Sequence, residues 1–302
     1  MKKIPVAQTI AFAYRFLVTE IGTIVGIAWL PAVLSSAMSY LARFYEIQNR
    51  ALIDAGDAQA RGVYLLLSLA SLMVVLFASS MVAVAITRAA LGRERPPGTV
   101  LLYFAAGPSE RRMFAANTRY LLGAGVLLGL ALLISFAALF LSGTPLDAPE
   151  QVRPTPATIL AVLIVWAAFL YAGASIVRMG FMLPPTVVME EKGGLKRSHE
   201  LTKGNFWRVL AIMLVLGGPF VLLLLGGEAV VLRSALGPDF LRTNPAEFFQ
   251  KADEAMDAKL LPWQIFSAII FVLASGLIYS GAAFAYRSVT QPENARRLDV
   301  EA

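Results

Sequence analysis

The stretch that decides the fold runs from Leu183 to Gly218 and reads LPPTVVMEEKGGLKRSHELTKGNFWRVLAIMLVLGG. An apolar segment is followed by an acidic, glycine-rich turn over Glu190–Gly194. The next residues, Leu195–Lys203, predict a short basic helix, and Gly204 stands where a left-handed residue would end it. From Phe206 the sequence again has the hydrophobicity of a membrane span. This order of turn, surface helix and break predicts a membrane-interface element that leads into a spanning helix.

The composition of the whole chain is that of a membrane protein. Of its 302 residues, 58% are hydrophobic and 15% are charged, whereas soluble domains carry roughly 25% charged residues. The mean hydropathy is +0.68, and the apolar residues come in long blocks. The 26 Lys and Arg exceed the 20 Asp and Glu, but they lie between the apolar blocks. That placement favours control of topology and contact with anionic lipid over nucleic-acid binding.

Six segments are long and apolar enough to cross the bilayer, which takes about 20 helical residues for about 30 Å of hydrocarbon. They must be helices, because a chain in lipid has to satisfy its own backbone hydrogen bonds. We therefore expect an all-α polytopic fold, with residues 1–302 forming one integral membrane domain. The predicted spans are 21–41, 63–86, 120–141, 157–177, 209–231 and 265–286.

The distribution of positive charge predicts the orientation of this bundle. With six spans, 18 of the 26 Lys and Arg fall on the side that also carries both termini, and 8 fall on the other side. Basic residues concentrate on the cytoplasmic side of membrane proteins. Both termini are therefore expected in the cytoplasm.

Two further amphipathic helices and a repeat are predicted around the spans. Pro5–Thr19 has apolar residues at three- and four-residue spacing and is expected to lie in the membrane interface. Asn244 and Pro245 begin a second amphipathic helix, which would lie on the outer membrane surface or cover the bundle as a lid. Aligning Pro31 with Pro219 suggests three repeated two-span units. The alternative is that any helix entering a membrane has this appearance.

The sequence offers little that indicates chemistry. It has no cysteine and one histidine, His199, so thiolate chemistry and clusters of His ligands for a metal are excluded. No nucleophile–base triad, phosphate-binding loop or dinucleotide turn occurs. We therefore predict no catalytic, cofactor-binding or metal-ligating residues. An alternative is acid–base work on a membrane lipid by His199 and Glu200.

A transport role would depend on Glu228, near the outer end of the fifth span, because the middles of the six spans carry no ionisable group. The Gly217-Gly218-Pro219 and Gly226-Gly227 clusters could loosen that span and expose its backbone to a substrate. Packing of neighbouring helices is the simpler explanation for these glycines.

The residues around the break after the basic helix are the candidate interfacial site. They combine cations for anionic lipid, a Trp suited to the headgroup boundary and two residues that tolerate a left-handed conformation. The candidates are Lys196, Arg197, His199, Glu200, Lys203, Gly204, Asn205, Trp207 and Arg208.

The run from Leu195 to Leu210, LKRSHELTKGNFWRVL, also resembles a known pattern. It is similar to the membrane domain fused to some bacterial glycerophosphodiester phosphodiesterases and to the related stand-alone YciC-like membrane proteins. Those families often have a Trp where this chain has His199. The resemblance implies an integral protein of the bacterial cytoplasmic (inner) membrane. It carries over no hydrolase activity, since nothing in this chain matches the soluble catalytic barrel.

These observations lead to two functional hypotheses. The first is a non-catalytic membrane module that interacts with anionic lipid headgroups on the cytoplasmic face or organises protein partners. The second is a transporter or lipid translocator that uses a cavity near the glycine-rich fifth span.

Overall fold

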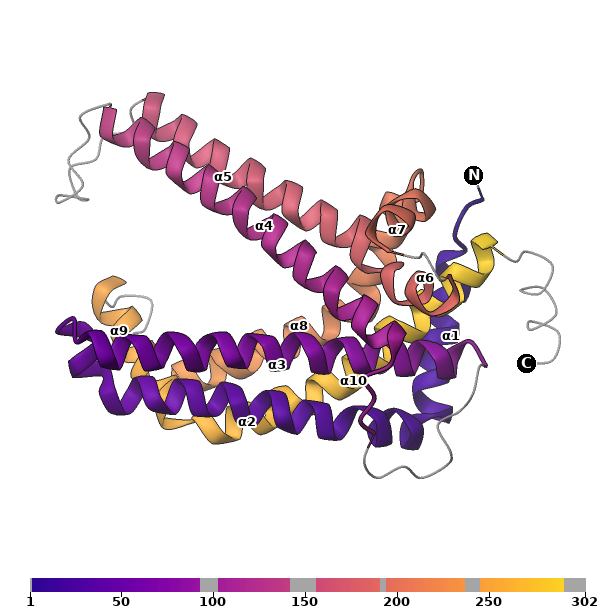
Figure 1. The fold of residues 1–302 in the computed structure, drawn as a ribbon, viewed down its shortest axis with the longest axis horizontal. Helices are drawn as coiled ribbons and strands as arrows, with labels where there is room; N and C mark the ends of the chain where they lie inside the picture. The colour runs from indigo at the N-terminus through magenta and orange to yellow at the C-terminus, as the bar shows by residue number, and fades with distance from the viewer. Residues whose placement is uncertain (1, 93–102, 142–155, 191–193, 237–244, 291–302) are drawn as a thin grey trace.

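The computed structural model describes residues 2–92, 103–141, 156–190, 194–236 and 245–290, and within these ranges it is all-helical (Figure 1). The elements, in chain order, are α1 (Val6–Thr19), α2 (Ile21–Asp54), α3 (Ala58–Ala90), α4 (Pro108–Leu141), α5 (Pro156–Ser175), the π-helix η2 (Ile176–Gly180), α6 (Leu183–Met189), α7 (Leu195–Thr202), α8 (Phe206–Leu236), α9 (Pro245–Ala258) and α10 (Leu260–Thr290).

Six of these helices are long and apolar enough to cross a membrane, and they are the six predicted from the sequence. They are α2, α3, α4, α5 continued through η2 and α6, α8, and α10. Most extend well beyond the predicted spans, because helical hydrogen bonding continues where the apolar composition ends. The helix α2, for example, continues to Asp54, although its apolar run ends near Leu41.

Four of the spanning helices, α2, α3, α8 and α10, form the body of the molecule (Figure 1). The helix α1 crosses one end of this body and packs on α10 and α8. Next to it lie α6, α7 and the C-terminal end of α10, and we call this end of the molecule the α7 end. The opposite end carries α9 and is called the α9 end.

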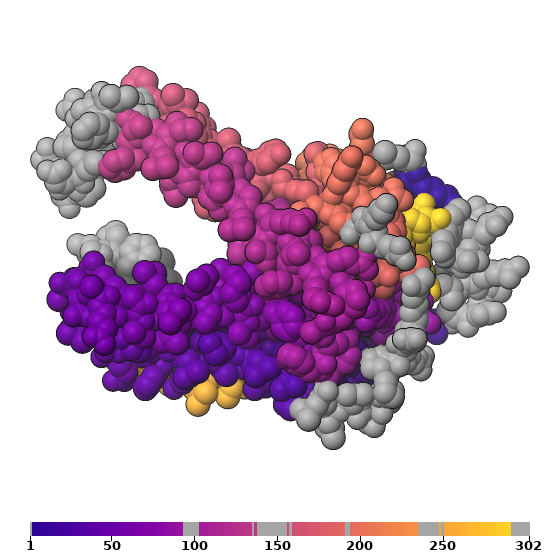
Figure 2. All heavy atoms as spheres, in the orientation of Figure 1, coloured from indigo at the N-terminus to yellow at the C-terminus, as the bar shows by residue number. Residues whose placement is uncertain are grey.

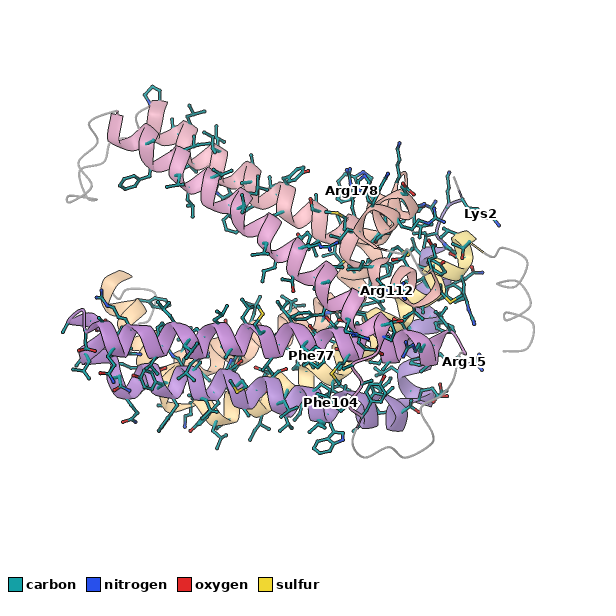
Figure 3. All side chains as sticks on the ribbon, in the orientation of Figure 1. Lys2, Arg15, Phe77, Phe104, Arg112 and Arg178 are labelled. Carbon is teal, nitrogen blue, oxygen red and sulfur yellow. The ribbon has the colours of Figure 1, made fainter. Side chains whose placement is uncertain are left out.

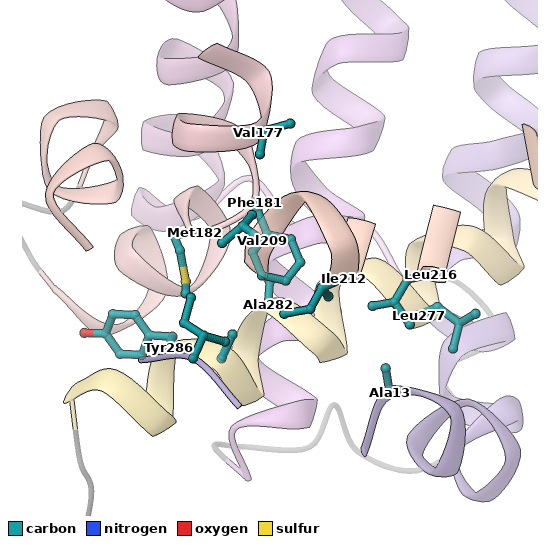
Figure 4. Packing of buried hydrophobic residues seen from close by; sticks show 12 residues of the cluster. Ala13, Val177, Phe181, Met182, Val209, Ile212, Leu216, Leu277, Ala282 and Tyr286 are labelled. Atoms are coloured by element: carbon teal, nitrogen blue, oxygen red, sulfur yellow. The ribbon is translucent and has the colours of Figure 1, made fainter. Parts of the chain in front are cut away.

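The most densely packed core lies at the α7 end. Figure 4 shows one cluster there, in which side chains of α1, η2, α8 and α10 meet the loop residues Phe181 and Met182. Gly276 and Gly281 of α10 allow close helix contacts in this region. A Cβ at Gly281 would stand 2.6 Å from Leu216 Cδ1, and one at Gly276 would stand 2.9 Å from Ile24 Cδ1.

Glycine spacing alone does not locate the helix contacts, because glycine is frequent in membrane helices whether or not it lies at a contact. An added Cβ at Gly22, Gly125 or Gly129 would meet nothing within 4 Å. The glycines at close contacts between helices are Gly227 of α8 and Gly276 and Gly281 of α10, where a Cβ would stand 3.0 Å or less from a neighbouring side chain.

The helices α4 and α5 form a hairpin that diverges from the body (Figures 1 and 2). Only 6% of the apolar window of α4 is buried, compared with 50% for α3. The α3–α4 contact includes a 6.0 Å ring contact between Phe77 and Phe114 and a 3.0 Å hydrogen bond from Asn117 Nδ2 to Ser80 Oγ. Beyond this point the two helices separate and leave a wedge-shaped cleft that opens towards the α9 end (Figure 2).

At the other end, ion pairs tie α9 to the extension of α2. Arg43 Nε lies 2.8 Å from Asp257 Oδ1, and Arg50 Nη2 lies 2.7 Å from Asp257 Oδ2 and 2.9 Å from Asp253 Oδ2. The predicted amphipathic helix is present and begins at Pro245 as expected, whereas the cap expected at Asn244 lies outside the described residues. Its acidic face is turned towards the arginines of α2.

The threefold repeat stays a prediction. Separate short helices precede α2 and α8, as the repeat requires, but α4 begins at Pro108 and continues directly into its span. The charged helix predicted to begin in Gly107–Met113 and to run into a span is present as the first part of α4.

Candidate functional site

The short helix α7 is fixed to the end of α5 by two hydroxyl groups. Ser198 Oγ donates to the carbonyl oxygen of Met179 at 2.5 Å, and Thr202 Oγ1 donates to that of Arg178 at 2.6 Å. Both carbonyls belong to η2, where residue i accepts from residue i+5. For Met179 that residue is Pro184, which has no N–H. Ser198 therefore satisfies a backbone acceptor that the π-helix leaves open at Met179, and Thr202 adds a second link at Arg178.

Gly204 and Asn205 then turn the chain into α8 and hold the N-terminal segment. Gly204 has φ +77°, the left-handed conformation predicted for it, and Asn205 N donates to Thr202 O at 2.9 Å. The buried Asn205 side chain accepts from Ile4 N at 3.0 Å and donates to Lys2 O at 2.9 Å. The side-chain amide of Asn205 thus joins the turn between α7 and α8 to the segment before α1.

Arg208 completes this junction. Its Nη1 atom donates to the carbonyl oxygen of Ile4 at 2.8 Å. The sequence suggested that Arg208 would anchor the span at the lipid surface, and in the structure its guanidinium also anchors the segment before α1.

Glu190 links α6, α7, α10 and α4. Its carboxylate accepts from Arg197 Nε at 3.1 Å and from the Tyr286 hydroxyl at 2.9 Å, and its carbonyl accepts from Arg112 Nη1 at 3.0 Å. The hydrogen bond to Glu190, followed by that to Glu200, raises the pKa of the Arg197 guanidinium above its ordinary value. Arg197 is therefore engaged within the protein, unlike the other cations of α7.

A second ion pair joins α3 to the start of α4. Arg88 Nη1 lies 2.9 Å from Oε1 of Glu110, whose side chain is fully buried. The other oxygen, Oε2, has no hydrogen-bond partner among the described residues. Burial raises the pKa of the nearby Tyr103 phenol, and the charge of Glu110 raises it further. The sequence places Glu110 in a charged stretch at the start of a helix, and nothing in that local pattern indicates its burial against Arg88.

The other candidates from this stretch form an exposed surface. Lys196 and His199 are exposed on α7, and Lys203, directly after the end of that helix, is also exposed. Glu200 is also exposed, and Trp207 at the start of α8 is 77% exposed. Figure 3 shows Lys2, Arg15, Arg112 and Arg178 at this same end of the molecule. The α7 end therefore combines exposed positive charge with an exposed indole.

Three lateral grooves lie elsewhere on the helices, two with almost entirely apolar linings and one that also carries Arg119, Tyr120 and Ser175. One of about 530 Å³ lies between α2 and α10, and one of about 480 Å³ lies between α2, α3 and α4. The third, of about 390 Å³, lies between α4 and α5 and reaches Met179 and Leu195. Glu228 is partly buried in α8 and lines none of these three.

The fifth span is not broken at its glycine and proline residues. Helix α8 runs from Phe206 to Leu236 with Pro219 inside it. An added Cβ at Gly227 would stand 3.0 Å from the Trp263 ring, so this glycine serves the packing of α8 against α10. Gly227 therefore lies at a helix–helix contact, as the simpler explanation of the glycines predicts.

No family model, curated protein or solved structure matches this chain.

Proposed function

We propose that the protein is a non-catalytic module of the bacterial cytoplasmic membrane that organises anionic lipid, or a protein partner, at its α7 end. The observation that carries this proposal is the rigid mounting of α7. Ser198 and Thr202 hold the helix on η2. The exposed Lys196 on the helix and Lys203 directly after it therefore form a fixed cationic surface.

The energetics of such a surface suit an anionic leaflet. A Lys near anionic headgroups contributes about 1 kcal/mol of membrane attraction. Because the backbone of α7 is already ordered, binding lipid costs little further backbone entropy. Trp207 lies beside these cations, and Trp is favoured at the headgroup boundary. Charge and indole together support contact with lipid headgroups.

The cytoplasmic placement of the α7 end follows from the excess of Lys and Arg on the side of the termini. The bacterial membrane follows from the sequence resemblance at Leu195–Leu210. The two larger grooves have almost entirely apolar linings, which suit hydrocarbon better than the hydrated substrate of a transporter.

The test is a lipid-selectivity measurement on the purified full-length protein. Native mass spectrometry in mixed micelles of phosphatidylglycerol and phosphatidylcholine should show preferential binding of phosphatidylglycerol. The double variant Lys196→Gln/Lys203→Gln should lower that affinity by about 30-fold, given about 1 kcal/mol for each Lys and about 1.4 kcal/mol for each factor of ten. A matched control, Lys251→Gln/Lys259→Gln, removes two exposed cations near α9 and should leave the preference unchanged. Equal binding of the two lipids by the wild-type protein would refute the lipid role.

A further inference from the structure

We propose that the groove between α4 and α5 is a binding site for one anionic phospholipid, with an acyl chain in the groove and the phosphate on Arg119. This inference rests on the proposed lipid role and names a separate site for it. None of the nine interfacial candidates from the sequence lines this groove.

The shape of the groove comes from small residues on α4. Gly123 and Ala124 leave a hollow that continues to Leu127, and Tyr171 and Ala172 of α5 form the facing wall. The Tyr120 hydroxyl donates to the Ala172 carbonyl at 2.9 Å, which ties the two helices together beside the hollow. The groove is therefore held open by a fixed helix pair, and its volume is about 390 Å³.

The length of the groove fits a hydrocarbon chain in one leaflet. Arg119 and Leu127 are both lining residues, and a helix rises about 1.5 Å per residue, so the groove extends about 12 Å along α4. Half of the hydrocarbon thickness is about 15 Å. An acyl chain entering beside Arg119 would thus lie along the groove through most of its leaflet.

The charge at the mouth selects the headgroup. Arg119 is exposed and makes no hydrogen bond or ion pair with the described residues, whereas Arg88 and Arg197 are paired with carboxylates. A phosphodiester would give the free guanidinium the paired, charge-assisted acceptors that it lacks. The mouth is closed by Met179 and Leu195, and Leu195 is followed by the exposed Lys196. Two neighbouring cations favour a lipid with net negative charge over a zwitterionic one.

The experiment reads occupancy of the groove from one tryptophan. Tyr171 lines the groove and is 67% exposed, so a tryptophan introduced as Tyr171→Trp reports what lies against this wall. A variant with this tryptophan alone (Trp29→Phe, Trp166→Phe, Trp207→Phe, Trp263→Phe) is reconstituted in vesicles containing brominated phosphatidylglycerol or brominated phosphatidylcholine. We expect stronger quenching by the brominated phosphatidylglycerol at equal mole fraction.

Two substitutions and a matched control locate the site. Arg119→Gln should reduce the phosphatidylglycerol preference at position 171 by about two- to fivefold, as for a partly exposed ion pair. Gly123→Leu should abolish it by filling the groove, since an added Cβ at Gly123 meets nothing within 4 Å and the helix can accept the side chain. Gly125→Leu is equally unhindered but lies outside the groove lining, so it should change nothing.

The outcomes separate this inference from the proposed function. A phosphatidylglycerol preference at position 171 that survives both Arg119→Gln and Gly123→Leu overturns the site. Equal quenching by the two lipids at position 171, while the whole protein still selects phosphatidylglycerol through Lys196 and Lys203, also overturns it. If Gly123→Leu instead dissociates an oligomer in light scattering, a second copy of the chain is the occupant and the lipid site is wrong. If the whole wild-type protein shows no preference for phosphatidylglycerol over phosphatidylcholine, the proposed function itself is refuted.

Discussion

Replacing Asn205 with alanine should release the N-terminal segment from the α7 end. The Asn205 side chain is 2% exposed and makes two hydrogen bonds to backbone groups of Lys2 and Ile4, which are about 200 residues away in the sequence. Ile4 is fully buried, so its N–H has no water to replace the lost acceptor. A typical hydrogen bond contributes about 1 kcal/mol, and a buried group left without a partner costs about 1–3 kcal/mol. We therefore expect the local contact to weaken by about 2–3 kcal/mol.

The absence of cysteine from the chain makes this measurable with a thiol reagent. A single cysteine introduced as Ile4→Cys is buried while the segment is docked and reacts only when it detaches. A loss of 2–3 kcal/mol corresponds to an increase of about 30- to 150-fold in the detached population, at about 1.4 kcal/mol for each factor of ten. The labelling rate should rise by the same factor when Asn205→Ala is added.

The control for this prediction is Asn49→Ala. The Asn49 amide donates to Tyr45 O in its own helix at 3.0 Å, so its loss removes a local hydrogen bond and no long-range contact. It should leave labelling at position 4 unchanged. If Asn205→Ala accelerates labelling less than threefold, packing alone holds the segment and the assignment of Asn205 as its clamp is wrong.

Three other predictions follow from buried contacts. Glu110→Gln should destabilise the protein by about 2–4 kcal/mol, because it breaks a buried ion pair. The control Glu200→Gln, at an exposed carboxylate, should change the stability little. Thermal unfolding in detergent measures both variants. Gly281→Leu should lower the unfolding temperature, since even its Cβ would be 2.6 Å from a neighbouring side chain, whereas Gly125→Leu should not. The pKa of Tyr103 is raised, so its neutral phenol stabilises the fold up to the unfolded pKa of about 10. This contribution to stability is lost as the pH rises through the folded pKa. Unfolding measured against pH should therefore lose less stability at alkaline pH in Tyr103→Phe than in the wild-type protein.

The sequence predicted the spans correctly because each carries its own signal. A run of about 20 apolar residues needs no partner to be recognised as a membrane helix. The surface helix at Leu195–Thr202 and the left-handed Gly204 were also predicted, since both depend on local residue types. The extension of α2 to Asp54 was not predicted, because the residues of that extension are largely polar. Its ion pairs with α9 explain why the helix continues there.

The internal roles of the interfacial residues were not predictable from local pattern. Arg197, Asn205 and Arg208 were proposed for the membrane surface, and the structure gives each of them partners in other elements. These partners lie 7 to more than 200 residues away, so no motif spacing encodes the contacts. A buried Asn beside exposed Lys residues looks, in one sequence, like another polar residue of the same surface.

The arrangement of polar contacts also explains why the α4–α5 hairpin diverges. Its described polar links to the rest of the molecule lie near the α7 end, at Glu110, Asn117 and the η2 carbonyls. Towards the α9 end, α4 and α5 expose large apolar side chains. In hydrocarbon, apolar surfaces gain little from meeting each other, because lipid tails are equally apolar. The hairpin is thus fixed where polar groups must be satisfied and is free to diverge where lipid can fill the space, which places the lipid-binding groove on the arm least constrained by the body.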